Sequence, residues 1–145
     1  MYWTTKRWFN IWYCLEDEIP ANTAKASARE TKIRVHGGIL HSIIVTIPPG
    51  SANLVHAQLR HSSYFILPRN EDESIEGEHI NVNYREWYKM QASLNTLTMR
   101  AWNDDDTYDH KVRMLLGVLP KDVLEVEEGY LKTLQTFIRL FRRRT

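Results

Sequence analysis

Short apolar runs, broken at regular intervals by turn-forming residues, are the feature that most limits what this chain can fold into. Residues 32–35 alternate basic and apolar side chains before Gly37-Gly38, and the β-branched run 39–47 ends at Pro48-Pro49-Gly50. Alternation with a period of two is typical of half-buried strands, and clusters of glycine and proline end such strands. The pattern therefore predicts strands between residues 31 and 120.

Further apolar runs follow the first two at a similar spacing. They occupy residues 54–59, 64–67, 80–82, 97–101 and 111–119. About seven short strands, one roughly every ten residues, indicate a sandwich or small barrel instead of alternating strands and helices. The predicted fold class is mainly β, an antiparallel β-sandwich of the jelly-roll or immunoglobulin-like kind.

The end of the chain carries the pattern of an amphipathic α-helix. Pro120 precedes it, acidic residues fill its start, and basic residues fill its end, an order that complements the helix dipole. Tyr130, Leu134, Phe137 and Phe141 recur at spacings of four, three and four, which places them on one apolar stripe.

The first 30 residues differ in composition from the strand region. Residues 1–19 are rich in aromatic side chains, and residues 20–30 are small and polar. We expect an N-terminal aromatic arm and linker (1–30), a β-sandwich domain (31–120) and a C-terminal helix (121–145). The arm is expected to pack into a neighbouring subunit, because tryptophan and tyrosine bury large areas at interfaces; the alternative is a membrane-interface anchor.

Composition excludes several classes of protein. With 145 residues, the chain fits one domain. Its 19 basic and 18 acidic residues nearly balance, so no overall field recruits nucleic acid. The single Cys14 excludes an intrachain disulfide framework and a cysteine-rich zinc site. Neither a signal peptide nor an apolar run of about 20 residues is visible, so we expect synthesis in the cytoplasm and no membrane span.

The acidic segment 103–110 is the strongest candidate for metal chemistry. Asp104, Asp106 and Asp109 are candidate oxygen ligands for calcium. The EF-hand pattern fails because its central glycine and closing glutamate are missing. We therefore favour a polar turn whose Asn and Asp side chains accept from backbone donors, and we expect no metal and no cofactor.

The remaining reactive side chains form no catalytic pattern. Two histidine pairs, 36/41 and 56/61, have an odd spacing, which places the members of a strand pair on opposite faces. Cys14 has no histidine near it in the sequence, and no serine lies in a nucleophile elbow. We therefore expect no enzymatic activity.

Three stretches carry a resemblance to a known group of proteins. Residues 37–59, 65–78 and 97–120 resemble small β-sandwich virion structural proteins from phage and environmental viral genomes, in which a glycine-led strand ends at a Pro-Gly turn and an Asn-Asp-Asp loop precedes a histidine. The resemblance spans about residues 37–120 and implies a structural role without catalysis. The arm and the helix lie outside it.

On this basis we expect a virion structural protein, such as a capsid decoration, vertex or tail component. It would act by assembly, with other virion proteins and copies of itself as partners, as a homo-oligomer located in the virion. The residues expected at subunit contacts are Trp3, Trp8, Trp12, Tyr130, Leu134, Phe137 and Phe141.

The alternative is a non-catalytic binding module that recognises a glycan or host surface through exposed aromatic residues and the acidic loop. Trp87, Tyr88 and Trp102 discriminate between the two, since binding favours an open groove and assembly favours burial. The arginines at 142–144 suit phosphate or anionic lipid, but we favour compensation of the helix end and expect no specific nucleic-acid partner.

Overall fold

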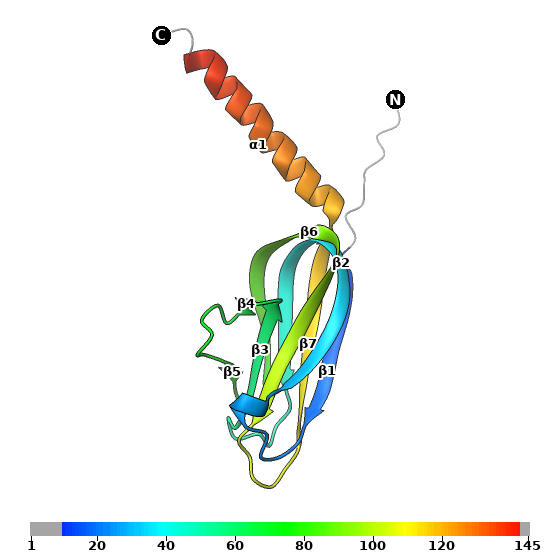
Figure 1. Cartoon of the computed structure of the whole chain (residues 1–145), viewed down its shortest axis with the longest axis vertical. Coiled ribbons are helices and arrows are strands. Elements are labelled where there is room, and N and C mark those ends of the chain that lie inside the picture. The colour runs from blue at the N-terminus through cyan, green and yellow to red at the C-terminus, as the bar shows by residue number, and fades with distance from the viewer. Residues whose placement is uncertain (1–9, 143–145) are drawn as a thin grey trace.

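The computed structural model describes residues 10–142, without the side chains of residues 124, 127 and 140–142. It confirms a mainly antiparallel β fold with one C-terminal helix (Figure 1). In chain order the elements are β1 (Ile11–Ile19), a short 3-10 helix (Lys25–Ser27), β2 (Arg29–Ile47), β3 (Val55–His61), β4 (Tyr64–Leu67), β5 (Ile75–Glu76), β6 (Ile80–Asn103), β7 (His110–Pro120) and α1 (Lys121–Arg142).

The seven strands belong to one sheet. Their order is β1-β7-β2-β6-β3-β4, with β5 paired to β3, and each pairing is antiparallel. Two of the strands are long, because β2 has 19 residues and β6 has 24. The apolar runs predicted as separate strands at 32–35 and 39–47 are therefore one strand, and β6 likewise joins 80–82 to 97–101.

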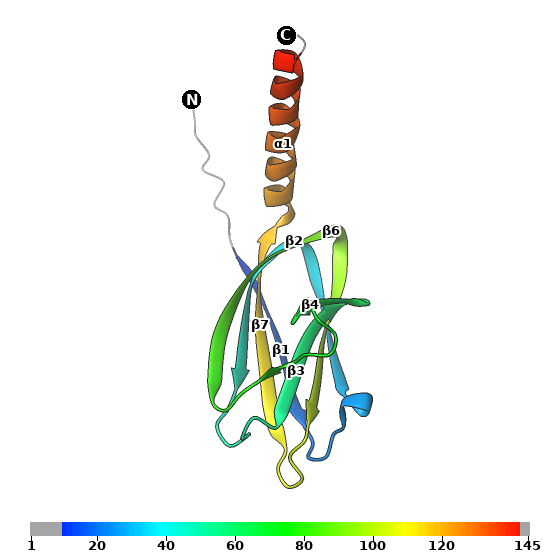
Figure 2. The same ribbon diagram turned by 90° about the vertical axis from the view of Figure 1, so that its left-hand side faces the viewer.

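The two long strands fold the sheet into two layers. Residues 29–36 of β2 pair with the second half of β6, whereas residues 38–47 pair with residues 80–90. β7 and β1 extend the sheet from the second half of β2, which completes the first layer. β3 and its partners extend it from the second half of β6, which completes the second layer. The sandwich is thus one folded sheet, in which two strands cross from layer to layer (Figure 2).

Gly37 and Gly38 lie at the bend of β2, where the backbone of neighbouring strands comes very close. A Cβ on Gly37 would lie 2.2 Å from the carbonyl oxygen of Ala92, and a Cβ on Gly38 would lie 1.9 Å from that of Leu119. Gly38 also has a φ of 150°, and the register with β6 shifts at this point. The glycine pair therefore permits a bend and a bulge within one strand, and does not end that strand.

One hydrophobic core lies between the layers. It draws buried residues from every strand, which accounts for the alternating apolar pattern of the sequence. Its fully or nearly fully buried large members include Ile19, Leu40, Ile43, Ile47, Leu59, Ile66, Met90, Leu97, Met99, Met114 and Leu116.

The expected boundary of the sandwich at residue 31 is wrong, because residues 11–19 form the edge strand β1. This strand pairs with β7 along its whole length. Leu15 is only 2% exposed and Ile19 is fully buried, so both belong to the core. The strand is hard to recognise in the sequence, because Trp12 and Tyr13 stand side by side and three acidic residues separate Leu15 from Ile19. Of the expected arm, residues 1–9 lie outside the described part of the chain.

Side-chain hydrogen bonds hold β1 beside the first half of β2, although the two strands share no ladder. The Asp17 carboxylate accepts from the Arg29 Nε at 2.9 Å and from the Thr31 hydroxyl at 2.9 Å. The His36 backbone N–H donates to the Tyr13 hydroxyl at 3.1 Å. These contacts join the two layers along the side of the sandwich where residues 20–30, expected to form a linker, connect β1 to β2.

Replacement of Leu15 tests whether β1 belongs to the core. Leu15→Ala should lower the free energy of unfolding by about 2–5 kcal/mol, because it leaves a cavity in packed surroundings. Cys14→Ala, at the adjacent exposed position, is the matched control and should change stability by less than about 0.5 kcal/mol. Urea unfolding followed by circular dichroism measures both. Equal stabilities for the two variants would show that residues 11–19 lie outside the core, as expected for a separate N-terminal arm.

The bend of β2 is tested by adding single methyl groups. Gly38→Ala should destabilise the fold by roughly 1–3 kcal/mol or more, since the new Cβ meets backbone that cannot move aside. Gly129→Ala is the control, because nothing lies within 4 Å of its Cβ position in the exposed helix. That variant should be neutral or slightly stabilising, since alanine is the better helix former. A thermal unfolding scan that shows similar values for both variants would disprove the steric argument.

Candidate functional site

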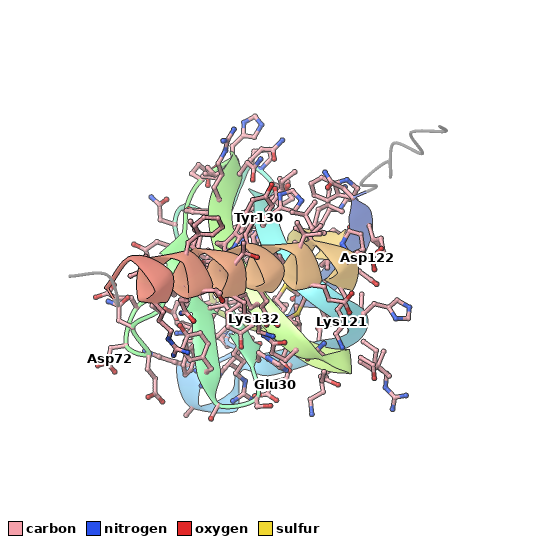
Figure 3. The ribbon with its side chains drawn as sticks, turned by 90° about the horizontal axis from the view of Figure 1, so that it is seen from above. Glu30, Asp72, Lys121, Asp122, Tyr130 and Lys132 are labelled. Atoms are coloured by element: carbon pink, nitrogen blue, oxygen red, sulfur yellow. The ribbon has the colours of Figure 1, made fainter. Side chains whose placement is uncertain are left out.

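α1 leaves the sandwich and carries its apolar stripe in the open. The helix begins directly after Pro120, as predicted, and extends away from the end of the two layers (Figures 1 and 2). Tyr130 is 72% exposed, and Leu134 and Phe137 are exposed by 56% and 57%. Figure 3 shows Tyr130 and Lys132 on opposite sides of the helix, as its amphipathic pattern requires.

The seven residues expected at subunit contacts fall into three groups. Tyr130, Leu134 and Phe137 share the exposed helix stripe, together with Leu131 and Ile138. Trp12 lies in β1, far along the chain from the stripe, and projects from the outer surface of the first layer. Trp3 and Trp8 lie outside the described residues, as does the side chain of Phe141. Their roles stay predictions.

An open groove crosses the outer surface of the first layer. Its volume is about 470 Å³, within the usual range for small-molecule sites of about 300–1,000 Å³. β1 contributes Trp12, β2 contributes His41 and Ser42, and β6 contributes Asn83, Arg85 and Trp87. We call this set the Trp12–Trp87 groove.

Gly117 in β7 makes room for the Trp12 side of the groove. It faces Trp12 in the β1–β7 register and Ser42 in the β2–β7 register. A Cβ at this position would lie 3.1 Å from the Trp12 indole and 3.1 Å from the His41 Nε2. The absence of a side chain therefore lets the indole lie across β7, where its ring meets the His41 ring edge-on, with centroids 6.4 Å apart.

Some polar groups of the groove are hydrogen-bonded to each other, and others have no partner among the described residues. The Ser42 hydroxyl donates to the Asn83 Oδ1 at 2.7 Å. His41 Nε2 is buried and has no hydrogen-bond partner among the described residues. Burial lowers the pKa of His41, so that its ring is neutral at pH 7. Among the described residues that line the groove, Arg85 is thus the charged one.

Trp87, Tyr88 and Trp102, which discriminate assembly from binding, differ in their exposure. Trp87 is 51% exposed and lines the groove with polar neighbours. Trp102 is only 4% exposed, because His56 stacks on it and Lys25 and Arg100 lie over its ring. Tyr88 is partly buried, with its hydroxyl 2.9 Å from the His61 Nδ1. An open aromatic groove therefore exists, but Trp87 is the one member of the trio that lines it.

The acidic segment is a turn organised by Asp105. The Asp105 Oδ1 accepts from the backbone N–H groups of Thr107 and Tyr108, and the Oδ2 lies 2.7 Å from the His110 Nε2. The Asn103 side chain donates to the backbone carbonyls of Tyr108 and Ile19. The segment thus satisfies backbone donors and acceptors, as the polar-turn interpretation predicts.

The three candidate calcium ligands have different partners and do not converge. The Asp104 carboxylate lies 3.1 Å from the His56 Nε2, and the Asp109 carboxylate accepts from the Ala21 backbone N–H. Asp106 accepts from the Thr107 hydroxyl. Within residues 10–142, no group of three or more potential metal ligands comes together.

No catalytic arrangement emerges among the described side chains. The Ser42 hydroxyl donates to an amide, not to a histidine. Cys14 is exposed on the outer surface of β1. His56 and His61, predicted to lie on opposite faces, contact Trp102 and Tyr88 respectively. Within the part of the chain that is described, no helix is long and apolar enough to cross a membrane.

The Trp12–Trp87 groove was not predicted from the sequence. Its residues come from three strands, and it needs the gap above Gly117, so that no single run of sequence contains it. The signal that was available is the alternation of Asn83, Arg85 and Trp87, which places two polar groups and an indole on one face of a strand.

Acid titration tests the part that Asp105 plays in the turn. The hydrogen bond with His110, and then those from the Thr107 and Tyr108 N–H groups, lower the pKa of Asp105 below its ordinary value of 3.8. Folding therefore gains stability from the ionised carboxylate at every pH above 3.8, and this contribution disappears as the pH falls through the lowered folded-state pKa.

Asp105→Asn should accordingly be less stable than the parent at neutral pH, and the difference should shrink as the pH falls below 3.8. Urea unfolding at a series of pH values measures it. Asp106→Asn is the control and should follow the parent throughout. A pH-independent difference for Asp105→Asn would show that shape alone matters at this position.

Comparisons with known proteins add little. No protein-family model and no curated protein matches the sequence. A crystal structure described as FLHE is similar at 6% identity, over 75% of this chain and 96% of that one, with a TM-score of 0.38. The Macrobrachium rosenbergii nodavirus P-domain is similar at 9% identity, over 76% and 92%, with a TM-score of 0.25. Likenesses at this level carry no argument about function.

Proposed function

We propose that the protein is a non-catalytic assembly protein that associates with copies of itself through α1. The observation that supports this most is the exposed stripe of Tyr130, Leu134 and Phe137 on a helix that the sandwich does not cover. An isolated amphipathic helix is marginal in water, and exposed apolar patches mark interaction sites. A partner that covers the stripe would take its apolar side chains out of water and stabilise the helix.

The spacing of the stripe favours another helix as that partner. The intervals of four and three between Tyr130, Leu134 and Phe137 average 3.5 residues, which is the repeat that keeps one seam facing a neighbouring helix. α1 has 22 residues and is therefore about 33 Å long, enough for about three heptads. A second copy of the chain supplies a matching helix without any further component.

The order of charges favours an antiparallel pair of helices. Acidic residues fill the first half of α1 in the sequence, and basic residues fill its last turns. In an antiparallel pair, the acidic start of each helix meets the basic end of the other, and a two-fold axis makes the interface self-complementary. The same acidic start argues against a membrane surface, because helices that lie in that interface carry a polar face rich in lysine and arginine.

The setting that we propose for this assembly is a virion. The resemblance over residues 37–120 to small virion β-sandwich proteins supports it. A capsid decoration, vertex or tail component, made in the host cytoplasm, would use the sandwich as a rigid body and α1 as the connection to other copies and to other virion proteins.

Self-association is tested by placing one charge on the stripe. Phe137→Asp should convert the oligomer to a 17.2 kDa monomer, because a carboxylate cannot be buried unpaired between apolar helices. Thr136→Asp introduces the same residue at the preceding position, on the polar side of the helix, and should leave the oligomer intact. Light scattering after size exclusion measures the mass, and circular dichroism verifies that both variants fold.

Two outcomes would contradict the proposal. A parent chain that is monomeric at high micromolar concentration has no self-association to explain. A Phe137→Asp variant that keeps the parental mass would move the interface away from the stripe.

A further inference from the structure

The Trp12–Trp87 groove carries recognition chemistry that neither the core nor the helix uses. The exposed fraction is 48% for Trp12 and 51% for Trp87, although both are large enough to bury more than 150 Å² each on average. Both indoles flank a polar floor on the outer surface of the first layer. A site with flat apolar walls and a few polar groups is the usual form of a small-ligand site.

The polar groups leave a definite set of unused hydrogen-bonding positions. Asn83 accepts from Ser42 through its Oδ1, which leaves its amide N–H groups without a partner among the described residues. The Ser42 oxygen keeps lone pairs that can accept. Arg85 has no carboxylate partner within the described part of the chain. The groove therefore offers donors, an acceptor and one positive charge.

Among the described residues of this surface, the neighbouring charges leave Arg85 to pair with one anionic group of the ligand. Lys111 and Arg113, on the same outer surface, both pair with Glu16, and Lys89 also has an interaction of its own. His41 adds no charge near neutral pH, because burial lowers its pKa. A nucleic-acid strand needs a row of free cations along its phosphates, and Arg85, the free cation among the described residues of this surface, does not supply that row.

A ring that bears hydroxyl groups and one carboxylate fits this set. Trp87 and Arg85 are two residues apart on one face of β6, so their Cα atoms are about 7 Å apart. A ring that lies on the Trp87 indole can thus direct its carboxylate to the guanidinium, which binds carboxylates in two parallel hydrogen bonds. Ring hydroxyls both donate and accept, as Asn83 and Ser42 together require.

We propose that the Trp12–Trp87 groove binds an acidic saccharide, with a sugar ring against Trp87, the carboxylate on Arg85, and hydroxyl groups on Asn83 and Ser42. This activity is independent of assembly through α1. The helix and the groove belong to different parts of the surface, so each can be removed without the other.

Titration of the full-length protein with tetragalacturonate tests the proposal. Calorimetry should give saturable binding, and the tryptophan fluorescence should change with it. Arg85→Gln should weaken binding at least about tenfold, because it removes a charged hydrogen bond. Arg85→Lys should retain more affinity than Arg85→Gln, since it keeps the charge. Arg34→Gln removes an exposed arginine from another part of the sheet and should bind like the parent.

A second variant and two further probes make the test decisive. Trp87→Ala should reduce the fluorescence response and weaken binding, while circular dichroism shows a parental fold. Phe137→Asp should bind like the parent. The proposal is overturned if neutral maltotetraose binds as well as tetragalacturonate, if oligothymidylate binds more tightly than either, if Arg85→Gln and Trp87→Ala bind like the parent, or if no saccharide binds.

Discussion

The close approach of backbones at Gly37-Gly38 is the constraint on which the rest of the structure depends. At this point β2 turns from one layer to the other, with the Ala92 and Leu119 carbonyls where side-chain carbons would otherwise lie. β6 turns with it, since the two strands pair on both sides of the bend. One core is enclosed because the sheet folds here, and β7, which continues into α1, is held against the same bend through the pairing of Gly38 with Pro120.

Local patterns in the sequence predicted the elements whose boundaries are also local. The runs at 54–59, 64–67 and 111–119 lie within or next to β3, β4 and β7, and Pro120 precedes the helix. Predictions were wrong where the structure of a segment depends on strands that are distant in the sequence. Gly37-Gly38 resembles a strand end unless its neighbours in β6 and β7 are known, and β1 resembles an aromatic arm unless its pairing with β7 is known.

The two candidate sites differ in the same way. The helix stripe repeats along one stretch of chain, so its members could be named from spacing alone, and Tyr130, Leu134 and Phe137 do lie together on one exposed face. The Trp12–Trp87 groove assembles residues from three strands above a glycine of a fourth. Its geometry depends on strand order, which the hydrophobic pattern does not encode. Trp87 and Trp102 show this, because Trp87 is exposed and Trp102 is buried, although both lie in β6 within similar stretches of sequence.

The direct junction between β7 and α1 has a mechanical consequence. β7 ends at Pro120 and the helix begins at Lys121, so no flexible segment separates them. β7 is bonded to β1 on one side and to β2 on the other, and antiparallel ladder bonds run perpendicular to the strands. A tensile load on the helix along β7 therefore shears both ladders at once, with many bonds resisting together, and does not peel them open one by one. The strand that bears the helix is thereby anchored in the most force-resistant direction that a sheet offers.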